Sequence, residues 1–279
     1  RGRIDSRWSL TSYSRLIADL PAERERDDEP EDVAAPAAPE DFADIRTFPR
    51  GPDAGTCLHT LLERLDGQRP ATAQPDLIAE TLARAGIDAR WQPATAAWLD
   101  AVRAVPLPGS CALADVGEHD RINELAFLFP LEQVSRHRLS SLLTTAGLRP
   151  LPTAEGRLQG LMKGFVDLVF RCDGRFYLVD YKSNHLGPDL THYGPEGLAA
   201  CMDDHHYHLQ YLIYTLAVQR YLQARLPGYN YAAHFGGAYY LFLRAMHPEH
   251  PAGTGVYHAR PDEGLIMALD SCCRGREAQ

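Results

Sequence analysis

Two aspartates and a lysine lie in short apolar segments, where charged side chains are unusual. Asp167 lies within residues 164–170, and Asp180 and Lys182 lie within residues 176–182. A carboxylate in an apolar strand is unfavourable unless it is paired, hydrogen-bonded or bound to a metal. Two carboxylates at close range also repel each other unless a divalent cation neutralises them. The pattern therefore favours a metal site with a lysine beside it.

The lysine is unusual in this composition. The chain has two lysines, Lys163 and Lys182, against 26 arginines, so arginine serves most cationic positions. A buried ammonium can lose its proton, position a water and stabilise charge on a phosphate, whereas a guanidinium stays protonated. Asp180 and Lys182 share one face of a strand, so a simple ion pair is the alternative interpretation. The rarity of lysine favours the functional interpretation.

A β-hairpin would position these three residues. The two apolar segments are separated by Arg-Cys-Asp-Gly-Arg, whose Asp173-Gly174 pair is a strong turn signal. Periodicity predicts further helices and strands around the hairpin. The expected helices are residues 55–65, 76–104, 135–143, 205–226 and 262–273, and the expected further strands are 121–131 and 238–243. This order indicates a mixed α/β sheet flanked by helices.

The first 47 residues read as the end of an upstream region followed by a linker. Residues 9–16 have strand or strand-to-helix character, and residues 21–44 are rich in Pro, Ala and acidic groups. The formal net charge is −9, and residues 19–44 alone carry eleven acidic residues and two arginines, so the rest sums to zero. The sequence therefore predicts a folded domain over residues 48–279, in a piece of a longer polypeptide.

Several protein classes are disfavoured. No apolar run is long enough to span a bilayer, and the first residues lack the apolar stretch of a secretory signal. Six scattered cysteines without a C-x-x-C pair indicate reduced thiols in a cytoplasm. No G-x-x-x-x-G-K-[ST] motif occurs, so no ATP site is expected in this chain.

The hairpin motifs resemble a known family. Gly-Phe-Val-Asp-Leu-Val-Phe at 164–170, followed by Tyr-Leu-Val-Asp-Tyr-Lys-Ser-Asn-His-Leu-Gly at 177–187, is similar to the PD-(D/E)XK nuclease superfamily and, within it, to RecB-type nuclease domains. Residues 55–59, 121–124, 209–217 and 234–244 fit the same pattern, so the resemblance covers roughly residues 48–266. It implies a restriction-endonuclease-like core with a central mixed β-sheet.

The resemblance also implies roles for individual residues. A divalent metal would be held by His59, Asp167, Asp180 and the backbone carbonyl of Tyr181, with Lys182, Asp180 and Asp167 catalytic. Gln210 and Tyr214 match a Q-x-x-x-Y element that lines the site and contacts DNA, and Glu124 matches a secondary acidic position. Oxygen ligands suit Mg²⁺, and one imidazole makes Mn²⁺ tolerable.

The function implied by the resemblance is that of a Mg²⁺-dependent deoxyribonuclease of the exodeoxyribonuclease V type. It would cut single-stranded ends unwound by an upstream helicase domain, beside RecC-like and RecD-like subunits, during recombinational repair of double-strand ends in a bacterial cytoplasm. One alternative is a catalytically silent module of this fold that binds DNA or partner subunits. Another is a related nuclease that acts on different ends or on RNA.

Other conspicuous residues are expected to be structural. His205, His206 and His208 have no second cluster that would complete a zinc site. Cys57 with Cys272 and Cys273 does not reproduce the four-cysteine pattern of relatives that carry an iron–sulfur cluster, so no cluster is predicted. Tyr207, Tyr211 and Tyr221 occur at helical spacing and are expected to pack in the core.

Overall fold

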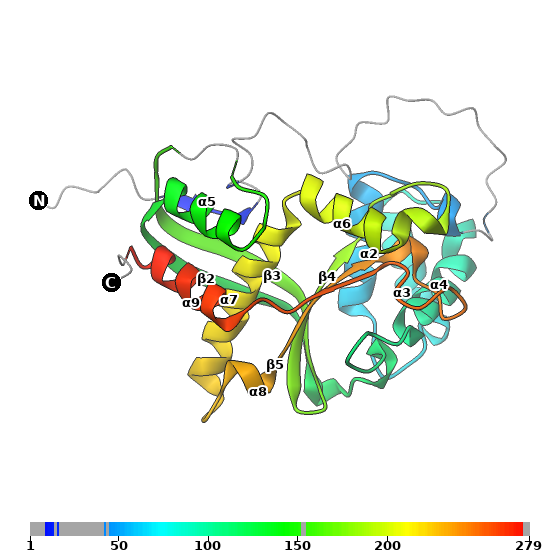
Figure 1. Cartoon of the computed structure of the whole chain (residues 1–279). Coiled ribbons are helices and arrows are strands. Elements are labelled where there is room, and N and C mark those ends of the chain that lie inside the picture. Colours follow the sequence, from blue (N-terminus) through cyan, green and yellow to red (C-terminus); the bar gives the residue numbers. More distant parts are fainter. Residues whose placement is uncertain (1–8, 14–15, 17–41, 43–44, 152–154, 276–279) are drawn as a thin grey trace, which may run out of the picture.

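The computed structural model describes residues 9–13, 16, 42, 45–151 and 155–275 (Figure 1). Apart from Phe42, the predicted linker at residues 21–44 lies outside these described residues. The described part is built from one mixed β-sheet with helices on both faces. This arrangement confirms the predicted α/β class.

The sheet has both parallel and antiparallel pairs. Its strands are β1 (Ser9–Thr11), β2 (Arg121–Ser135), β3 (Arg157–Cys172), β4 (Arg175–Lys182), β5 (Phe235–Phe242) and β6 (Val256–Ala259). The order is β1-β3-β4-β5-β6, and β2 pairs with β3 off this path. The β1–β3 and β4–β5 pairs are parallel, and the others are antiparallel. Because β4 and β5 are parallel neighbours, the loops that follow them leave from the same edge of the sheet.

Two hydrophobic clusters cover the two faces of the sheet. The helices are α2 (Pro52–Arg64), α3 (Pro75–Arg84), α4 (Gln92–Ala104), α5 (Arg136–Thr145), α6 (Pro195–Asp204), α7 (Tyr207–Arg225), α8 (Tyr231–His234) and α9 (Glu263–Cys273). Helices α2 to α4 pack on one face, and α5, α6, α7 and α9 contribute to the cluster on the other. None of the described helices is long and apolar enough to cross a bilayer.

The predicted β3–β4 hairpin is present, with Asp173 and Gly174 as its two turn residues. Both have positive φ angles, 48° and 75°, as a tight two-residue hairpin turn requires. Strand β3 is longer than the predicted segment 164–170, because its first half pairs with β1 and β2 rather than with β4. This extension was not predicted because Gly160 and Gly164 interrupt the alternation of apolar side chains.

Two predicted helices have different limits in the structure. The expected helix 76–104 is divided into α3 and α4, and Gly86 has a φ of 68° in the connection between them. The expected helix 205–226 begins only at Tyr207, because His206 adopts the left-handed conformation with a φ of 53°. The preceding residues form a separate helix, α6, that periodicity did not predict.

The segment around residues 9–16, which the sequence placed in an upstream region, packs against the described fold. Strand β1 pairs with β3 through Ser9↔Gly160 and Thr11↔Met162. Tyr13 and Leu16 are each 4% exposed and belong to the cluster around α7 and α9. The hydroxyl of Tyr13 donates to the backbone oxygen of His205 at 2.7 Å. This segment therefore contributes a strand and core side chains.

Candidate active site

The hairpin brings the two aspartates opposite each other. The pairing Leu168↔Val179 places Asp167 level with Asp180, at the point where β3 separates from β4. Beyond this point β4 continues against β5 to the pair Lys182↔Phe242. Asp180 is buried, whereas Asp167 is partly exposed. The separation of the two strands thus leaves a carboxylate pair at an opening in the sheet.

Lys182 is enclosed by polar and aromatic groups. Its Nζ lies 2.8 Å from Asp180 Oδ2 and donates to Gln210 Oε1 at 3.2 Å. The same atom lies 3.8 Å from the ring centroid of Tyr207, close enough for a cation–π interaction. The lysine side chain is only 9% exposed. Its ammonium therefore has a fixed position beside the aspartates.

His59 reaches the carboxylates from helix α2. Its Nδ1 lies 3.4 Å from Asp167 Oδ2, and its side chain is 36% exposed. Burial alone would lower its pKa, but the carboxylates of Asp167 and Asp180 outweigh this effect and raise the pKa of His59 to about 9. Helix α2 passes close to the end of β4, since a Cβ on Gly55 would lie 3.0 Å from Ser183 Oγ. Glycine at this position allows the close approach that brings His59 to the site.

The backbone of Tyr181 faces the same opening. Its N–H donates to Asp167 Oδ2 at 2.7 Å. In an extended strand, the N–H and C=O of one residue point to the same side. The carbonyl of Tyr181 is therefore directed toward the side of Asp167, as the predicted ligand role requires.

Burial and mutual repulsion both act on the charges of the two aspartates. Burial raises the pKa of Asp180, the ammonium of Lys182 opposes this shift, and the charge of Asp167 adds to it. Among the described residues, no group of three or more His, Cys, Asp and Glu side chains is already gathered as a metal cluster. The donor set is nevertheless two carboxylates, an imidazole and a backbone carbonyl, which suits Mg²⁺ or Mn²⁺. The residues at this opening therefore fit a divalent cation.

Gln210 and Tyr214, from helix α7, form a hydrogen-bonded chain with the lysine. Gln210 Oε1 accepts from Lys182 and from the Tyr240 hydroxyl at 2.9 Å, and its Nε2 donates to Tyr214 Oη at 3.2 Å. Both residues are buried, 6% and 8% exposed. This geometry links them to the lysine. Tyr240 was not predicted as a site residue. Its role becomes visible only in the structure, where it lies opposite Asp180 on β5.

Glu124 lies next to the aspartates on β2. The pairs Asn123↔Leu168 and Leu125↔Val166 place it level with Asp167. Its φ of 50° is unusual for a non-glycine residue. Burial, reinforced by the charge of Asp167, raises the pKa of Glu124. The structure thus brings Glu124 near the predicted site.

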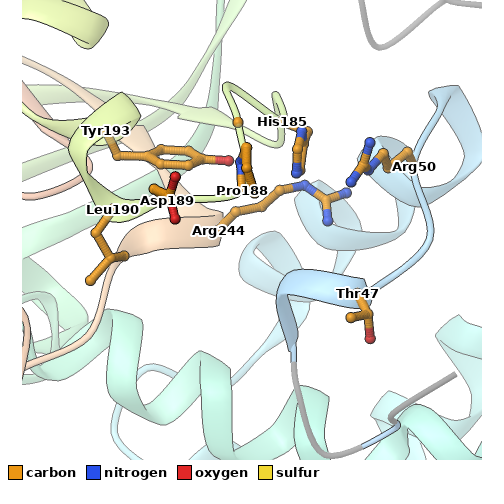
Figure 2. Close-up of a pocket in the computed structure, with 9 residues that line it drawn as sticks. Thr47, Arg50, His185, Pro188, Asp189, Leu190, Tyr193 and Arg244 are labelled. Atoms are coloured by element: carbon orange, nitrogen blue, oxygen red, sulfur yellow. The ribbon is translucent and has the colours of Figure 1, made fainter. Parts of the chain in front are cut away.

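A pocket of about 300 Å³ is lined in part by residues of the loop that follows β4. Figure 2 shows the side chains around it. Arg50, His185, Tyr193 and Arg244 are among its lining residues. The buried Arg244 guanidinium donates to the backbone oxygens of Ser183, Phe48 and Pro49, at 2.7, 3.0 and 2.7 Å. Sequence analysis did not identify Arg244, which joins the end of β4 to the segment that enters α2.

Asn184 is a third buried residue near the site that was not predicted from the sequence. It follows Ser183 directly, is 2% exposed, and neither polar atom of its amide has a hydrogen-bond partner among the described residues. Such a buried group is unusual in a folded protein. Its only sequence signal is its position two residues after Lys182.

The histidines and cysteines are scattered over the fold. His208 Nε2 pairs with Asp203 at 2.8 Å, and His206 occupies the left-handed position before α7. All six cysteines are free thiols, with Cys57 in the cluster of α2 to α4 and Cys272 and Cys273 in the opposite one. The absence of an iron–sulfur cluster stays a prediction. Tyr207 and Tyr211 are buried core residues, and Tyr221 is partly buried against the core, as expected.

Comparison with known proteins points to the same family as the motifs. The model of the PD-(D/E)XK nuclease superfamily matches residues 37–266. The chain is 41% identical to the RecBCD enzyme subunit RecB of Escherichia coli over 82% of its length, which is 20% of that relative. It is 38% identical to RecB of Haemophilus influenzae, in a match that covers 83% of this chain and 19% of that relative. It is 35% identical to RecB of Mycobacterium tuberculosis, in a match that covers 98% of this chain and 29% of that relative. The chain thus spans about a fifth of the length of the first two relatives.

Proposed function

The chain belongs to the PD-(D/E)XK nuclease superfamily as a domain similar to the RecB nuclease, and from this membership we propose that it is a Mg²⁺-dependent deoxyribonuclease of the exodeoxyribonuclease V type. The observation that carries the proposal is the enclosure of Lys182 beside Asp180, with Asp167 opposite and His59 in contact with it. Lys182 is also held by Gln210 and the ring of Tyr207, and Asp167 also accepts from the N–H of Tyr181, so the arrangement is more than two ion pairs.

In this proposal the divalent cation is held by Asp167, Asp180, His59 and the carbonyl of Tyr181. When bound, Mg²⁺ supplies polarisation of the scissile phosphate and a lowered pKa for a bound water. The repulsion between the two aspartates supports this assignment, because the charge of Asp167 adds to burial in raising the pKa of Asp180. Mn²⁺ would be tolerated because one ligand is an imidazole.

Lys182 would orient the attacking water and stabilise charge on the phosphate. Its ammonium is held by Asp180, Gln210 and the ring of Tyr207, so it has little rotational freedom. Gln210 is in turn fixed by hydrogen bonds with Tyr240 and Tyr214. These contacts support a positioning role for Gln210, acting through the lysine, in place of a direct contact with DNA.

The proposed substrate is a single-stranded DNA end released from unwound duplex. The relatives are named as RecB subunits of a RecBCD enzyme, which supports RecC-like and RecD-like partner subunits. The chain covers about a fifth of their length, which leaves room for the proposed upstream helicase domain in the same polypeptide. The biological role proposed for the domain is the processing of double-strand ends during recombinational repair in the cytoplasm of a bacterium.

A catalytically silent module is the second candidate. It is favoured by the closed contacts His59–Asp167 and Lys182–Asp180, which balance the charges as ion pairs. Against it stands the burial of these charges, because a binding module would gain more stability from apolar residues at the same positions.

Degradation of end-labelled single-stranded DNA distinguishes the two candidates. Wild-type chain with Mg²⁺ is compared with Asp180→Ala and with wild type in EDTA. Cleavage that requires Mg²⁺ and disappears in the variant supports the nuclease and its site. Full activity of Asp180→Ala contradicts the site, and wild type that binds DNA without cutting it favours the silent module.

A further inference from the structure

The β2–β3 ribbon presents an unusual exposed face next to the aspartates. Phe165 and Leu128 are 44% and 60% exposed, although most large apolar side chains of the described residues are buried. Phe165 pairs with Ala126 across the ribbon, and Lys163 pairs with Leu128. These four residues are called the ribbon platform below. An exposed apolar face of this kind usually marks a binding surface.

The platform is continuous with the metal site. Lys163 and Phe165 alternate along β3 and therefore share one face, and Asp167 follows two residues further along the strand, about 7 Å beyond Phe165. Met162 and Val166 point to the opposite face and are buried in the cluster around α7 and α9. A strand of nucleic acid whose scissile phosphate lies at Asp167 would therefore meet Phe165 next and Lys163 after it.

The chemistry of the platform matches single-stranded nucleic acid. Lys163 Nζ lies 5.4 Å from the ring centroid of Phe165, within cation–π range. Lys163 makes no ion pair with any described residue, so its ammonium is available to a phosphate. An exposed aromatic ring beside a free cation is the pairing that sequence-tolerant single-strand binding uses, since bases stack on the ring while the cation contacts the backbone.

We propose that the ribbon platform binds the single strand next to the scissile phosphate, with a base stacked on Phe165 and a backbone phosphate on Lys163. This inference rests on the proposed nuclease function, because the metal site sets the position of the strand. A base in duplex DNA has no free face, so the platform also selects unwound DNA. Docking of a protein subunit on the same face is the competing outcome of the test.

Tryptophan fluorescence tests the stacking directly. A Phe165→Trp variant is titrated with oligothymidylate while its fluorescence is recorded. EDTA is present to prevent cleavage. The chain has three tryptophans of its own: Trp91 and Trp98 are 2% and 5% exposed, and Trp8 lies outside the described residues. Unsubstituted chain corrects for their signal. The matched control is Met267→Trp, at an exposed position of α9, which packs on the other face of the ribbon. We expect quenching at position 165 by single strands, none by blunt duplex, and none at position 267.

Affinity measurements separate the two contacts. Phe165→Ala should weaken binding of labelled oligothymidylate about 5- to 150-fold, Phe165→Tyr should restore it, and an abasic strand should bind both forms equally. Lys163→Ala should lower the salt dependence of binding by about one unit of slope. Thermal unfolding of each variant establishes that the exposed substitution leaves the fold intact.

The outcomes distinguish the platform from the nuclease. If Phe165→Ala and Leu128→Ala both cleave and bind single-stranded DNA like wild type, the platform is overturned and the nuclease stands. Docking of a protein subunit then becomes the proposal for this face. Quenching at position 165 without any cleavage supports the platform and overturns the nuclease. Absence of both binding and cleavage overturns both.

Discussion

At the scale of single residues, the site depends on a lysine that an arginine cannot replace. The Lys182 ammonium fits between Asp180 Oδ2 at 2.8 Å, Gln210 Oε1 at 3.2 Å and the Tyr207 ring at 3.8 Å. A guanidinium is planar, larger and permanently charged. The space around Lys182 therefore supports a function that requires a compact ammonium.

Lys182→Arg should therefore reduce cleavage about 100-fold or more, the range of a positioned proton-transfer group. Binding of Mn²⁺, measured by titration calorimetry, should persist because Asp167, Asp180 and His59 are unchanged. Near-normal turnover in this variant would refute a specific role for the lysine. Arg84→Lys is the control, because it exchanges the same two side-chain types at an exposed position of α3, outside the site.

The residue scale is also where the sequence was most informative. Asp167, Asp180 and Lys182 were recognisable because charged residues break an apolar strand pattern, and the structure brings all three together. The burial of Gln210 and the partners of Arg244 were not predictable. Both depend on contacts between segments that are distant in sequence, and neither residue type breaks its local pattern.

At the scale of elements, Arg244 holds together the segments that position the site. It follows β5 and donates to carbonyl groups both after β4 and before α2, which carries His59. Arg244→Met would leave three backbone oxygens without this donor in a buried place, at about 1 to 3 kcal/mol each. The relative position of α2 and β4 therefore depends on this one side chain.

Arg244→Met should lower the free energy of unfolding by at least about 3 kcal/mol. Cleavage measured well below the melting temperature should fall as well, since His59 loses its fixed distance from Asp167. Arg84→Met, on an exposed face of α3, is the control and should leave both quantities near wild type. Equal stability of the two variants would show that the Arg244 contacts contribute little.

The loop after β4 predicts a pH dependence of stability. Burial, together with the charges of Arg50 and Arg244 and a smaller effect of His192, lowers the pKa of His185 to about 4. In the unfolded chain the ordinary value is about 6.5. Between these values the unfolded state binds more protons, so stability is lost as the pH falls from about 6.5 to 4.

His185→Gln should therefore be less sensitive to acid than wild type. The difference in unfolding free energy between the two proteins should change by at most about 1.4 kcal/mol per pH unit in this window and stay constant above pH 7. Denaturant unfolding at several pH values measures it. A difference that is constant from pH 4 to 7 would mean that His185 titrates normally in the folded state.

Element boundaries were predicted less well than element types. The hairpin was found because Asp173-Gly174 is a local signal that needs no tertiary context. The start of α7 was predicted two residues early, because the left-handed conformation of His206 has no signal in the sequence, and helix α6 was not predicted at all. The first half of β3 was missed because its partners, β1 and most of β2, are remote in sequence or less regular in pattern.

At the scale of the whole molecule, the packing of residues 9–16 bears on where the domain begins. The sequence predicted a domain beginning at Phe48, after an acidic linker. Strand β1 nevertheless pairs with the half of β3 that leads to Asp167, and Tyr13 and Leu16 are buried in the cluster around α7 and α9. We propose that the domain is discontinuous, with its first strand separated from the rest by the acidic segment.

Removal of residues 1–47 should therefore destabilise the fold. Burial of Tyr13 and Leu16 contributes roughly 1.5 to 3 kcal/mol each, so a loss of about 3 kcal/mol or more is expected. For a domain of this size such a loss corresponds to a melting temperature lower by about 6 to 12 °C. Differential scanning calorimetry of the truncated and full-length chains measures the change.

Two further variants identify the cause of any destabilisation. Tyr13→Ala combined with Leu16→Ala in the full-length chain should reproduce the part of the loss that comes from residues 9–16. The rest is expected from Phe42 and Ile45, which pack against the cluster of α2 to α4. Neutralising the acidic residues within 19–44 should have little effect, because the linker interpretation assigns them no core role. If the truncated and full-length chains have the same melting temperature, the domain begins at Phe48 and β1 adds nothing to its stability.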